Sequence, residues 1–377
     1  MLKVIYTHDI FAFQRFGGIS RYFVEIIKRI PLETAKISVF AGLHVNEYLK
    51  ILSDAQVRGL KVPVFGGGAR AYMILNALMY YTRSMVNDLA QRMWLRTDPE
   101  TVVHLSNYSS SLPRTKVKMV VTAYDMIQEL FPQIYPGYRV ITQLKKVSFE
   151  RADRIIAISE CTKKDLVRFF GVEESKVTVI HLGNPLEHII PIEPANIAGA
   201  PYILYVGERA GYKNFEALIL AYARSSKLKA NFELVLFGGG TLTPSERKRF
   251  GEMGVAQFVH HTGGEDSLLA GYYRNARAFV WPSLYEGFGI PLLEAMGSRC
   301  PVVCSNAGPM PEVVGDAGIY FDPASAEELQ GVLETVLFDN TLLEEKMELG
   351  LKRAAEFSWD RAARETVDLY RSLVRPS

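Results

Sequence analysis

Cysteine, charge of one sign and long apolar runs are all scarce in this chain of 377 residues. Three cysteines without CxxC spacing cannot build a disulfide framework, do not suggest a zinc site, and favour a reducing compartment. No run of about 18 apolar residues occurs, and the N-terminus lacks the charged, apolar and small-residue regions of a signal peptide. We therefore expect a cytoplasmic protein that could still lie on a membrane as a peripheral component.

Several familiar catalytic signatures are also missing. The chain contains no HExxH, no Walker GK[ST] and no GxSxG, so metalloproteolysis, P-loop chemistry and α/β-hydrolase chemistry have no sequence support. The formal net charge is only +2, which does not point to nucleic acid as a partner. Residues 1–196 carry +7 and residues 197–377 carry −5, so the halves could differ in partner.

The chain is long enough for about two domains, and two series of alternating patterns support that number. In the first half, short apolar runs typical of buried parallel strands occupy residues 3–6, 37–40, 102–105, 117–123, 154–158 and 176–180. Helical patterns lie between them at residues 19–30, 70–95, 138–152 and 159–170. This alternation predicts a doubly wound α/β sheet.

A proline-rich segment at residues 184–201 separates the two series. After it, strands are expected at 202–206, 232–237, 257–259, 278–281, 302–304 and 319–321, and helices at 214–225, 244–253, 266–275, 291–297 and 326–340. We predict a first Rossmann-like domain over 1–190 and a second over 200–358.

Two glycine-containing segments are candidate anion sites. Gly17 and Gly18 follow the first strand and precede a helix, where backbone N–H groups can bind phosphate. A tight turn without a ligand explains the same pattern. The segment GGGARA at residues 66–71 matches a dinucleotide fingerprint, but Pro63 interrupts the preceding run and no acidic residue follows about 20 positions later, which favours a plain loop.

The start of the second series, YVGERAGYKNF, places Arg209 and Lys213 between a strand and a helix. The carboxyl ends of parallel strands line the ligand crevice of an open α/β sheet, so both cations are candidates to bind a diphosphate. Two solvated loop cations are the alternative.

The segment EGFGIPLLE brings Glu286 and Glu294 close to a strand end and a helix start. Ionised carboxylates accept hydrogen bonds from vicinal hydroxyls, which suits a sugar-containing ligand. Gly287 and Gly289 allow backbone N–H groups to approach such a ligand. Taken alone, Glu294 also fits a structural role as a helix-start acid.

With these motifs in this order, the chain resembles the family 4 retaining glycosyltransferases of the GT-B fold. The likeness rests on Glu-x7-Glu with its internal GFG, on EAMGSRCPVVCSNAGPMPEVVGDAGIYFDP, on GGISRYF, and on YVGERAGYKNF. It implies two Rossmann-like domains facing a central cleft, the first for the acceptor and the second for the nucleotide sugar. It also implies that a terminal helix at residues 359–377 crosses back to the first domain.

The resemblance assigns roles to the candidate residues. Glu294 would hold the ribose hydroxyls, and Glu286 would hold the sugar ring together with the backbone of Gly287, Phe288 and Gly289. Arg209 and Lys213, assisted by the amides of Gly17 and Gly18, would neutralise the leaving diphosphate. No metal and no cofactor is expected, in line with the absence of a DxD-type cluster placed to hold a divalent cation.

Two further side chains are candidates for the site. Tyr124 stands where the family usually has a histidine that contacts the donor sugar; it keeps a hydroxyl but carries no charge near pH 7, and it could instead pack as a core aromatic. His261, beside an expected strand end, is a candidate for the base pocket. The seven histidines show no ligand spacing along the sequence.

Residues 70–96 combine methionines, leucines and aromatics with four arginines. Such a helix can lie on an anionic membrane near a lipid-linked acceptor, although packing on its own sheet is the more common use of an amphipathic helix.

We expect a retaining hexosyltransferase of surface polysaccharide or lipopolysaccharide assembly, with a glycan or lipid-linked acceptor and no nucleic acid partner. GDP-mannose is the first candidate donor and a UDP-hexose the second. A sugar-nucleotide epimerase or hydrolase, and a catalytically silent binding subunit, are the alternatives.

Overall fold

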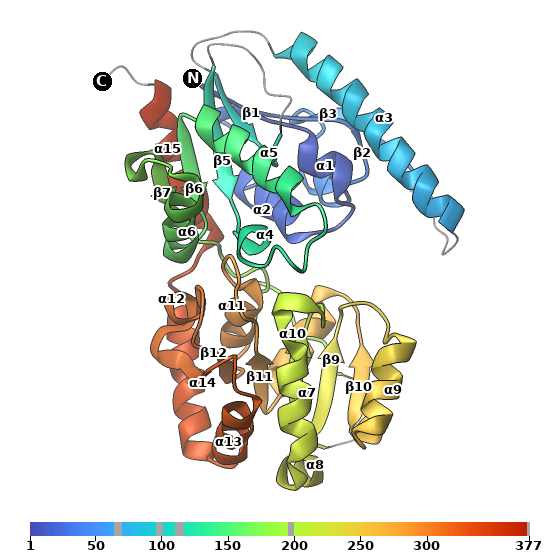
Figure 1. Ribbon diagram of the computed structural model, residues 1–377. Coiled ribbons are helices and arrows are strands. Elements are labelled where there is room, and N and C mark those ends of the chain that lie inside the picture. Colours follow the sequence, from blue (N-terminus) through green and yellow to red (C-terminus); the bar gives the residue numbers. More distant parts are fainter. Residues whose placement is uncertain (64–69, 96–100, 110–116, 195–199, 375–377) are drawn as a thin grey trace. The chain divides into compact units, whose positions relative to one another are not determined.

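The computed structural model describes residues 1–63, 70–95, 101–109, 117–194 and 200–374, and in helix α3 (Arg70–Trp94) it describes side chains from residue 79 onward. The chain divides into two compact units. Unit 1 contains Met1–Ile158, Thr162–Leu182 and Trp359–Ser377, and unit 2 contains Ser159–Cys161 and Gly183–Ser358. Each unit is built around a parallel sheet flanked by helices, as Figure 1 shows.

The described strands of unit 1 form a sheet in the order β3-β2-β1-β4-β5-β6-β7. They are β1 (Leu2–Tyr6), β2 (Ala35–His44), β3 (Val57–Lys61), β4 (Thr101–Leu105), β5 (Lys118–Ala123), β6 (Arg154–Ala157) and β7 (Val177–Val179). All neighbouring pairs are parallel, and the central strands are apolar on both faces, as a sheet covered by helices requires. The order reverses between β1 and β4, which marks the switch point where such sheets bind ligands.

Helices of unit 1 include α3 and six further elements. These are α1 (Asp9–Phe13), α2 (Gly18–Ile27), α4 (Ile127–Leu130), α5 (Tyr138–Arg151), α6 (Glu160–Phe170) and α15 (Trp359–Val374). The last helix, α15, packs against α2, β1 and β4 although it follows the whole of unit 2 in sequence. The return of the terminal helix to the first domain is therefore confirmed.

A buried polar chain fastens α15 to the sheet of unit 1. The Tyr370 hydroxyl lies 2.5 Å from His104 Nδ1 and 3.0 Å from the Tyr6 hydroxyl, and His104 Nε2 lies 2.9 Å from the Thr122 hydroxyl. Burial lowers the pKa of His104 to about 3, so the imidazole is neutral at physiological pH. The chain thus joins helix and strands by neutral hydrogen bonds without a buried charge.

Unit 2 has the sheet order β10-β9-β8-β11-β12-β13 among its described strands. These are β8 (Tyr202–Val206), β9 (Glu233–Phe237), β10 (Val259–Thr262), β11 (Ala278–Trp281), β12 (Val302–Ser305) and β13 (Gly318–Phe321). Its helices are α7 (Phe215–Arg224), α8 (Ser226–Asn231), α9 (Pro244–Glu252), α10 (Asp266–Asn275), α11 (Ile290–Gly297), α12 (Met310–Val314), α13 (Ala326–Val336) and α14 (Asn340–Ala354). The order reverses between β8 and β11, so unit 2 is a second Rossmann-like fold and the predicted fold class is confirmed.

Some predicted boundaries are wrong for identifiable reasons. The strand predicted at 257–259 begins at Val259 and ends at Thr262, because this edge strand exposes polar residues and is not a continuous apolar run. The helix predicted to reach residue 340 ends at Val336, since the Asp339 side chain accepts a hydrogen bond from Leu342 N and caps a new helix, α14. Strand β3 was not predicted, and residues 66–69 of the GGGARA segment lie outside the described residues.

Candidate functional site

The predicted residues of unit 2 gather at the carboxyl ends of its central strands. Arg209 and Lys213 follow β8, Glu286 follows β11, and Glu294 lies in α11. Strands β8 and β11 are neighbours at the switch point, so residues separated by more than 70 positions reach one edge of the sheet. The fold therefore brings together the residues that the separate sequence motifs suggested as one site.

Lys213 and Glu286 form an ion pair at this edge. Lys213 Nζ lies 2.8 Å from Glu286 Oε1 and 3.1 Å from Oε2, so the ammonium faces both carboxylate oxygens. The same nitrogen lies 4.7 Å from the centroid of the Trp281 ring, a cation–π distance. Both side chains keep some solvent exposure, 16% for Lys213 and 9% for Glu286. A lysine held over a tryptophan and beside a carboxylate has a fixed position before any ligand arrives.

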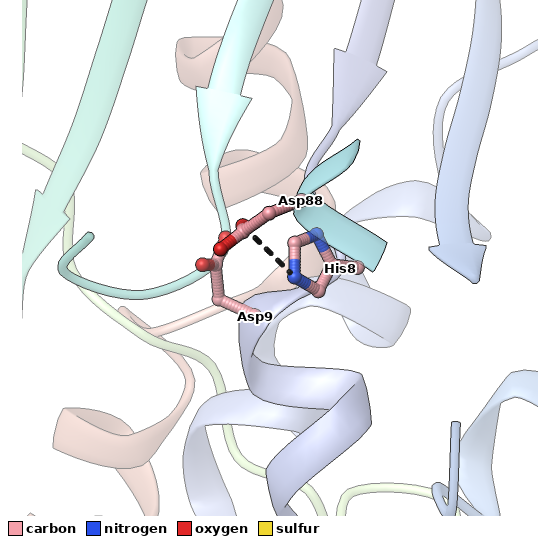
Figure 2. Close-up of side chains that lie close together, drawn as sticks. All are labelled: His8, Asp9 and Asp88. Carbon is pink, nitrogen blue, oxygen red and sulfur yellow. Dashed lines mark ion pairs between the residues drawn. The ribbon is translucent and has the colours of Figure 1, made fainter. Parts of the chain in front are cut away.

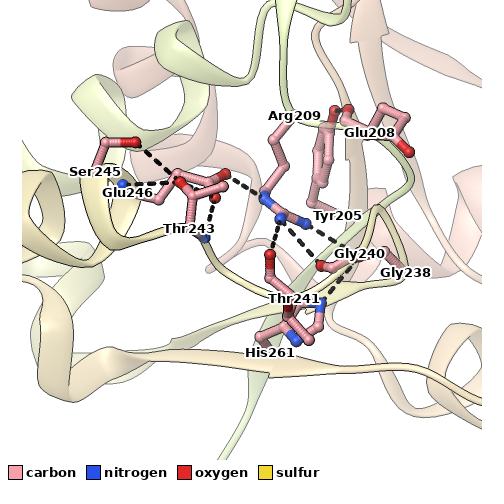
Figure 3. A network of polar contacts seen from close by, with 10 residues as sticks. All are labelled: Tyr205, Glu208, Arg209, Gly238, Gly240, Thr241, Thr243, Ser245, Glu246 and His261. Atoms are coloured by element: carbon pink, nitrogen blue, oxygen red, sulfur yellow. Dashed lines mark hydrogen bonds and ion pairs between the residues drawn. The ribbon is translucent and has the colours of Figure 1, made fainter. Parts of the chain in front are cut away.

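Arg209 is paired as well, with a carboxylate that no sequence motif indicated. Its Nε lies 2.6 Å from Glu246 Oε1, and its Nη1 and Nη2 donate to the carbonyl oxygens of Gly238 and Gly240 at 3.0 and 3.1 Å (Figure 3). Burial raises the pKa of Glu246, but hydrogen bonds from Arg209 and Thr243 outweigh it and hold the pKa at about 2. The Arg209 guanidinium therefore holds the loop after β9 by hydrogen bonds and pairs with Glu246, which is ionised at physiological pH.

The loop after β9 can take this shape only because it is made of glycine. Gly239 has φ +67°, and a Cβ there would lie 2.2 Å from the carbonyl oxygen of Gly207 and 2.8 Å from Arg209 Nη1. Any larger residue would push the loop away from the guanidinium. The loop is thus part of the same arrangement, and its three consecutive glycines at 238–240 are a sequence signal from which this close approach could have been predicted.

Glu294 is buried in α11 and accepts a hydrogen bond from the Tyr273 hydroxyl at 3.0 Å. The helix begins after Gly289, whose φ of +98° is a conformation that favours glycine. Phe288 is buried, with its ring centroid 5.7 Å from that of Phe357, and Gly287 completes the turn. Because α11 begins at Ile290, the carboxylate of Glu294 lies on the second turn of the helix and not on the first.

His261 lies one residue before the end of β10, with Nε2 3.0 Å from the carbonyl oxygen of Gly238. Its imidazole is thus attached to the loop that Arg209 holds, as Figure 3 shows. The structure places it beside the Arg209 cluster and does not identify a base pocket.

The glycines predicted in unit 1 stand at the start of α2. Gly17 is the N-cap and α2 begins at Gly18. The side-chain oxygen of Gln14 accepts a hydrogen bond from Ser20 N at 3.2 Å, and a Cβ on Gly17 would lie 2.4 Å from this oxygen. Gln14 thus serves the helix N-terminus as an internal acceptor, at the place where we expected an external anion.

Tyr124 follows β5 in unit 1 and is buried. Its ring centroid lies 6.0 Å from that of Tyr22 and 6.3 Å from that of Tyr108. Among the described residues its hydroxyl has no partner in hydrogen-bonding geometry, and burial raises its pKa well above the usual value. A neutral, buried hydroxyl without a protein partner is costly unless a ligand supplies one.

Glu246 and Gln14 are therefore the residues that sequence reasoning missed. Glu246 belongs to a capping box in which Thr243 Oγ1 accepts from Glu246 N at 3.2 Å and Thr243 N donates to Glu246 Oε2 at 2.7 Å. The pattern T-x-x-E before a helix was visible in the sequence and identifies a cap. Nothing in the sequence shows that the second carboxylate oxygen reaches Arg209.

Comparison with known proteins identifies the family of the chain. Residues 16–188 match the family model "Glycosyltransferase Family 4", and residues 191–354 match "Glycosyl transferases group 1". The "O-antigen chain mannosyltransferase B" of Escherichia coli is 26% identical over 387 residues, covering 99% of this chain and 100% of the relative. The "Serotype-specific mannosyltransferase WbdA" of Escherichia coli is 28% identical over 73% of this chain but only 36% of that relative.

A solved structure shows the same fold. Sucrose-phosphate synthase from Thermosynechococcus elongatus superimposes with a TM-score of 0.75 at 21% identity, and the match covers 99% of both chains. Two family models that together span almost the whole chain, and a full-length structural match, agree with the two Rossmann-like units. The chain is a glycosyltransferase that belongs to family 4 and has the GT-B fold.

Proposed function

We propose that the protein transfers a mannosyl residue from GDP-mannose to a hydroxyl of a glycan or lipid-linked acceptor, with retention at the anomeric carbon. The observation that carries this proposal is the pair of cations at the switch point of unit 2, Lys213 and Arg209, each held by a carboxylate. The names of the two relatives, both mannosyltransferases, support mannose as the sugar. A UDP-hexose is the second candidate donor.

Donor binding would exchange the protein carboxylates for phosphate oxygens. Lys213 and Arg209 would turn from Glu286 and Glu246 to the diphosphate, since phosphate matches both a lysine point charge and an arginine fork. Glu286, released from Lys213, would then accept hydrogen bonds from the sugar hydroxyls beside the backbone of 287–289. Glu294 would hold the ribose hydroxyls, with the Tyr273 hydroxyl fixing its orientation.

In the reaction the bond from the anomeric carbon to the diphosphate oxygen breaks and a bond to the acceptor oxygen forms on the same face. The acceptor proton passes to the departing phosphate oxygen, so the route requires no protein base. Lys213 and Arg209 would stabilise the charge that develops on the leaving group. Because two protein cations serve this purpose, we propose that the transfer requires no metal at the donor site.

The test is a thermal-shift panel of the full chain against GDP, UDP and ADP and their common sugar derivatives, with and without chelator. We expect stabilisation by GDP and GDP-mannose that is unaffected by the chelator, and release of GDP when an acceptor glycan is added. Stabilisation by UDP alone would indicate that the donor is a UDP-hexose and not GDP-mannose. No stabilisation by any nucleotide would overturn the donor site and favour a silent subunit, whereas sugar release without an acceptor product would favour a hydrolase.

We further propose that α3 places unit 1 on an anionic membrane surface, near a lipid-linked acceptor. The helix runs beside β2 (Figure 1). On the side toward the sheet, Trp94 stacks on Phe40, and the buried Asn87 bonds to the backbone of β2: its Oδ1 accepts from Leu43 N at 2.8 Å and its Nδ2 donates to Leu43 O at 3.0 Å. Its exposed face carries a stripe of large apolar side chains at four-residue spacing, namely Tyr81, Met85, Leu89 and Met93.

Such a stripe with the exposed Arg92 beside it suits the lipid interface, where apolar side chains are buried among acyl chains and arginine binds anionic headgroups. Among the described residues, no helix is long and apolar enough to cross a membrane. We expect co-sedimentation with phosphatidylglycerol vesicles but not with phosphatidylcholine vesicles, and its loss in Leu89→Glu. Leu32→Glu, at an equally exposed leucine of unit 1, is the matched control and should bind as the wild type does. Equal sedimentation of both variants would contradict the assignment.

A further inference from the structure

A cluster of metal-ligating side chains lies in unit 1, away from the residues assigned to the donor. His8 lies in the short connection after β1, Asp9 begins α1, and Asp88 comes from α3 (Figure 2). One ligand atom from each of the three lies within 4.8 Å of the other two. The position is the carboxyl end of β1 beside β4, the switch point of this sheet. Residues 80 positions apart are brought together there, which no spacing in the sequence could reveal.

The hydrogen bonds of His8 determine which ring nitrogen carries a proton. The Gln91 side-chain oxygen accepts from His8 N at 3.4 Å and lies 3.0 Å from His8 Nδ1. A backbone N–H can only donate, so the amide oxygen, not the amide nitrogen, faces His8. Nδ1 must then be protonated in order to bond to the same oxygen. In the neutral imidazole the free lone pair is consequently on Nε2.

Nε2 points to the two carboxylates, but it makes no hydrogen bond with the nearer one. Its distance to Asp88 Oδ1 is 3.6 Å, beyond hydrogen-bonding range. His8 is only 1% exposed, so a lone pair that faces anionic oxygens here is poorly solvated. A cation between them would be bound by this lone pair and by an oxygen of each carboxylate.

The separation fits one kind of cation. An ion ~2.1 Å from both Nε2 and Oδ1 would see the two atoms at an angle of about 120°, because they lie 3.6 Å apart. This angle is closer to tetrahedral than to octahedral geometry. One imidazole with two carboxylates, and an imidazole N–H bonded to an amide oxygen behind it, is a donor set for a divalent transition ion and not for Mg²⁺ or Ca²⁺.

We propose that His8, Asp9 and Asp88 bind a single Zn²⁺-type divalent ion with a water as the fourth ligand. Asp9 and Asp88 are half-buried, so small rotations of their side chains can bring the oxygens to bonding distance. The ion clamps α3 to the junction of β1 and α1 and stabilises unit 1, because the folded chain alone assembles the three ligands. This inference is independent of the donor site and of the transfer reaction.

The experiment is a calorimetric titration of the chelator-treated full chain with Zn²⁺, together with the visible spectrum of the Co²⁺-loaded protein. We expect one ion per chain, a higher melting temperature, and the strong absorption of tetrahedral Co²⁺, with no competition from Mg²⁺. His8→Asn keeps a side-chain N–H for Gln91 but removes Nε2, so it should fold and should lose more Zn²⁺ affinity than the roughly 10- to 100-fold that loss of an outer-shell partner costs. Asp88→Asn should weaken binding by at least about 10-fold, since it removes a charged ligand.

The matched control is His260→Gln, at a histidine of unit 2 whose Nε2 lies 2.9 Å from Glu233. It should bind Zn²⁺ as the wild type does. If the wild type binds no Zn²⁺, the cluster is a histidine–carboxylate ion pair and the proposal fails. It also fails if His8→Asn and Asp88→Asn bind as tightly as the control. Melting of each variant in chelator shows whether a loss reflects the ligand or the fold.

Discussion

Two lysines, a buried one in unit 1 and a half-buried one in unit 2, show what distinguishes a structural ion pair from an exchangeable one. Lys145 of unit 1 donates to Glu129, Gln128 and the carbonyl oxygen of Asp125 at 2.7, 2.8 and 2.9 Å. Lys213 of unit 2 has one carboxylate partner, Glu286, and otherwise faces aromatic rings. The exposed side-chain fraction is 2% for Lys145 and 16% for Lys213.

The two lysines differ in whether a ligand can replace the groups that bind their ammonium. Each donor hydrogen of Lys145 has its own acceptor, and Glu129 also accepts from the Thr142 hydroxyl, so the charge is fully compensated inside the protein. Lys213 depends on a carboxylate that a phosphate can imitate, and it stands at the strand edge where α/β sheets bind ligands. We therefore interpret Lys145 as structural and Lys213 as functional.

The largest effect is expected from Lys145→Ala. Removal of the ammonium leaves Glu129 buried without its ion partner, which should lower the free energy of unfolding by ~3–5 kcal/mol. Chemical denaturation followed by circular dichroism measures this loss. A loss below ~1 kcal/mol, typical of an exposed pair, would remove the distinction between the two lysines.

Lys213→Ala should affect turnover more than stability, in contrast to Lys145→Ala. Turnover should fall by ~100-fold or more, as when one stabilising donor is removed from a transition state. The free energy of unfolding should fall by less than in Lys145→Ala, because Lys213 is partly exposed. Steady-state kinetics measure the loss of turnover, and a binding titration measures the affinity for guanosine. This affinity should be unchanged, since guanosine carries no phosphate for Lys213 to bind. Lys227→Ala, at a lysine 4.0 Å from the Phe338 ring centroid, is the control. Equal loss of guanosine binding and turnover would argue against a role at the leaving group.

Glu294→Ala tests the buried carboxylate of unit 2 that accepts a hydrogen bond from the Tyr273 hydroxyl. Loss of a charged acceptor for the ribose hydroxyls should weaken nucleotide binding by roughly 1 to 3 kcal/mol. Calorimetry with GDP measures the change, and Glu233→Gln, at the start of β9, serves as a control carboxylate of the same sheet. Unchanged affinity in Glu294→Ala would refute the ribose role.

The smallest effect is expected from Tyr124→Phe in unit 1. Stability should not fall and should rise by up to ~1 kcal/mol, because the buried hydroxyl has no partner in hydrogen-bonding geometry among the described residues. Turnover should fall by about five- to tenfold if a substrate group is its partner, the value of one neutral hydrogen bond. Full activity would show that Tyr124 only packs.

The sequence was sufficient for the architecture. Apolar runs alternating with helical patterns predicted both sheets, and the positions of the charged residues after strands predicted at which end of the unit 2 sheet they gather. These features are local, since a strand and the loop after it are contiguous in the chain. The break at Asp339 was also local, but a side-chain cap inside a continuous helical pattern is easily overlooked.

The partners of those side chains could not be predicted. Glu246 reaches Arg209 across 37 positions and Glu286 reaches Lys213 across 73, and both approaches depend on how the loops after parallel strands fold together. The same holds for His8 and Asp88, which β1 and α3 bring together. Long-range pairing follows from packing of the whole domain and has no spacing to recognise.

The affinity of Glu246→Gln for GDP tests whether phosphate takes the place of a protein carboxylate at the proposed donor site. Glutamine keeps the N3 position of the capping box but removes the negative charge that competes for Arg209. If phosphate displaces this carboxylate, calorimetry should show GDP bound about three- to tenfold more tightly than by the wild type, with guanosine affinity unchanged. Equal or weaker GDP binding would contradict the exchange and leave Arg209 as a residue that only positions the glycine loop.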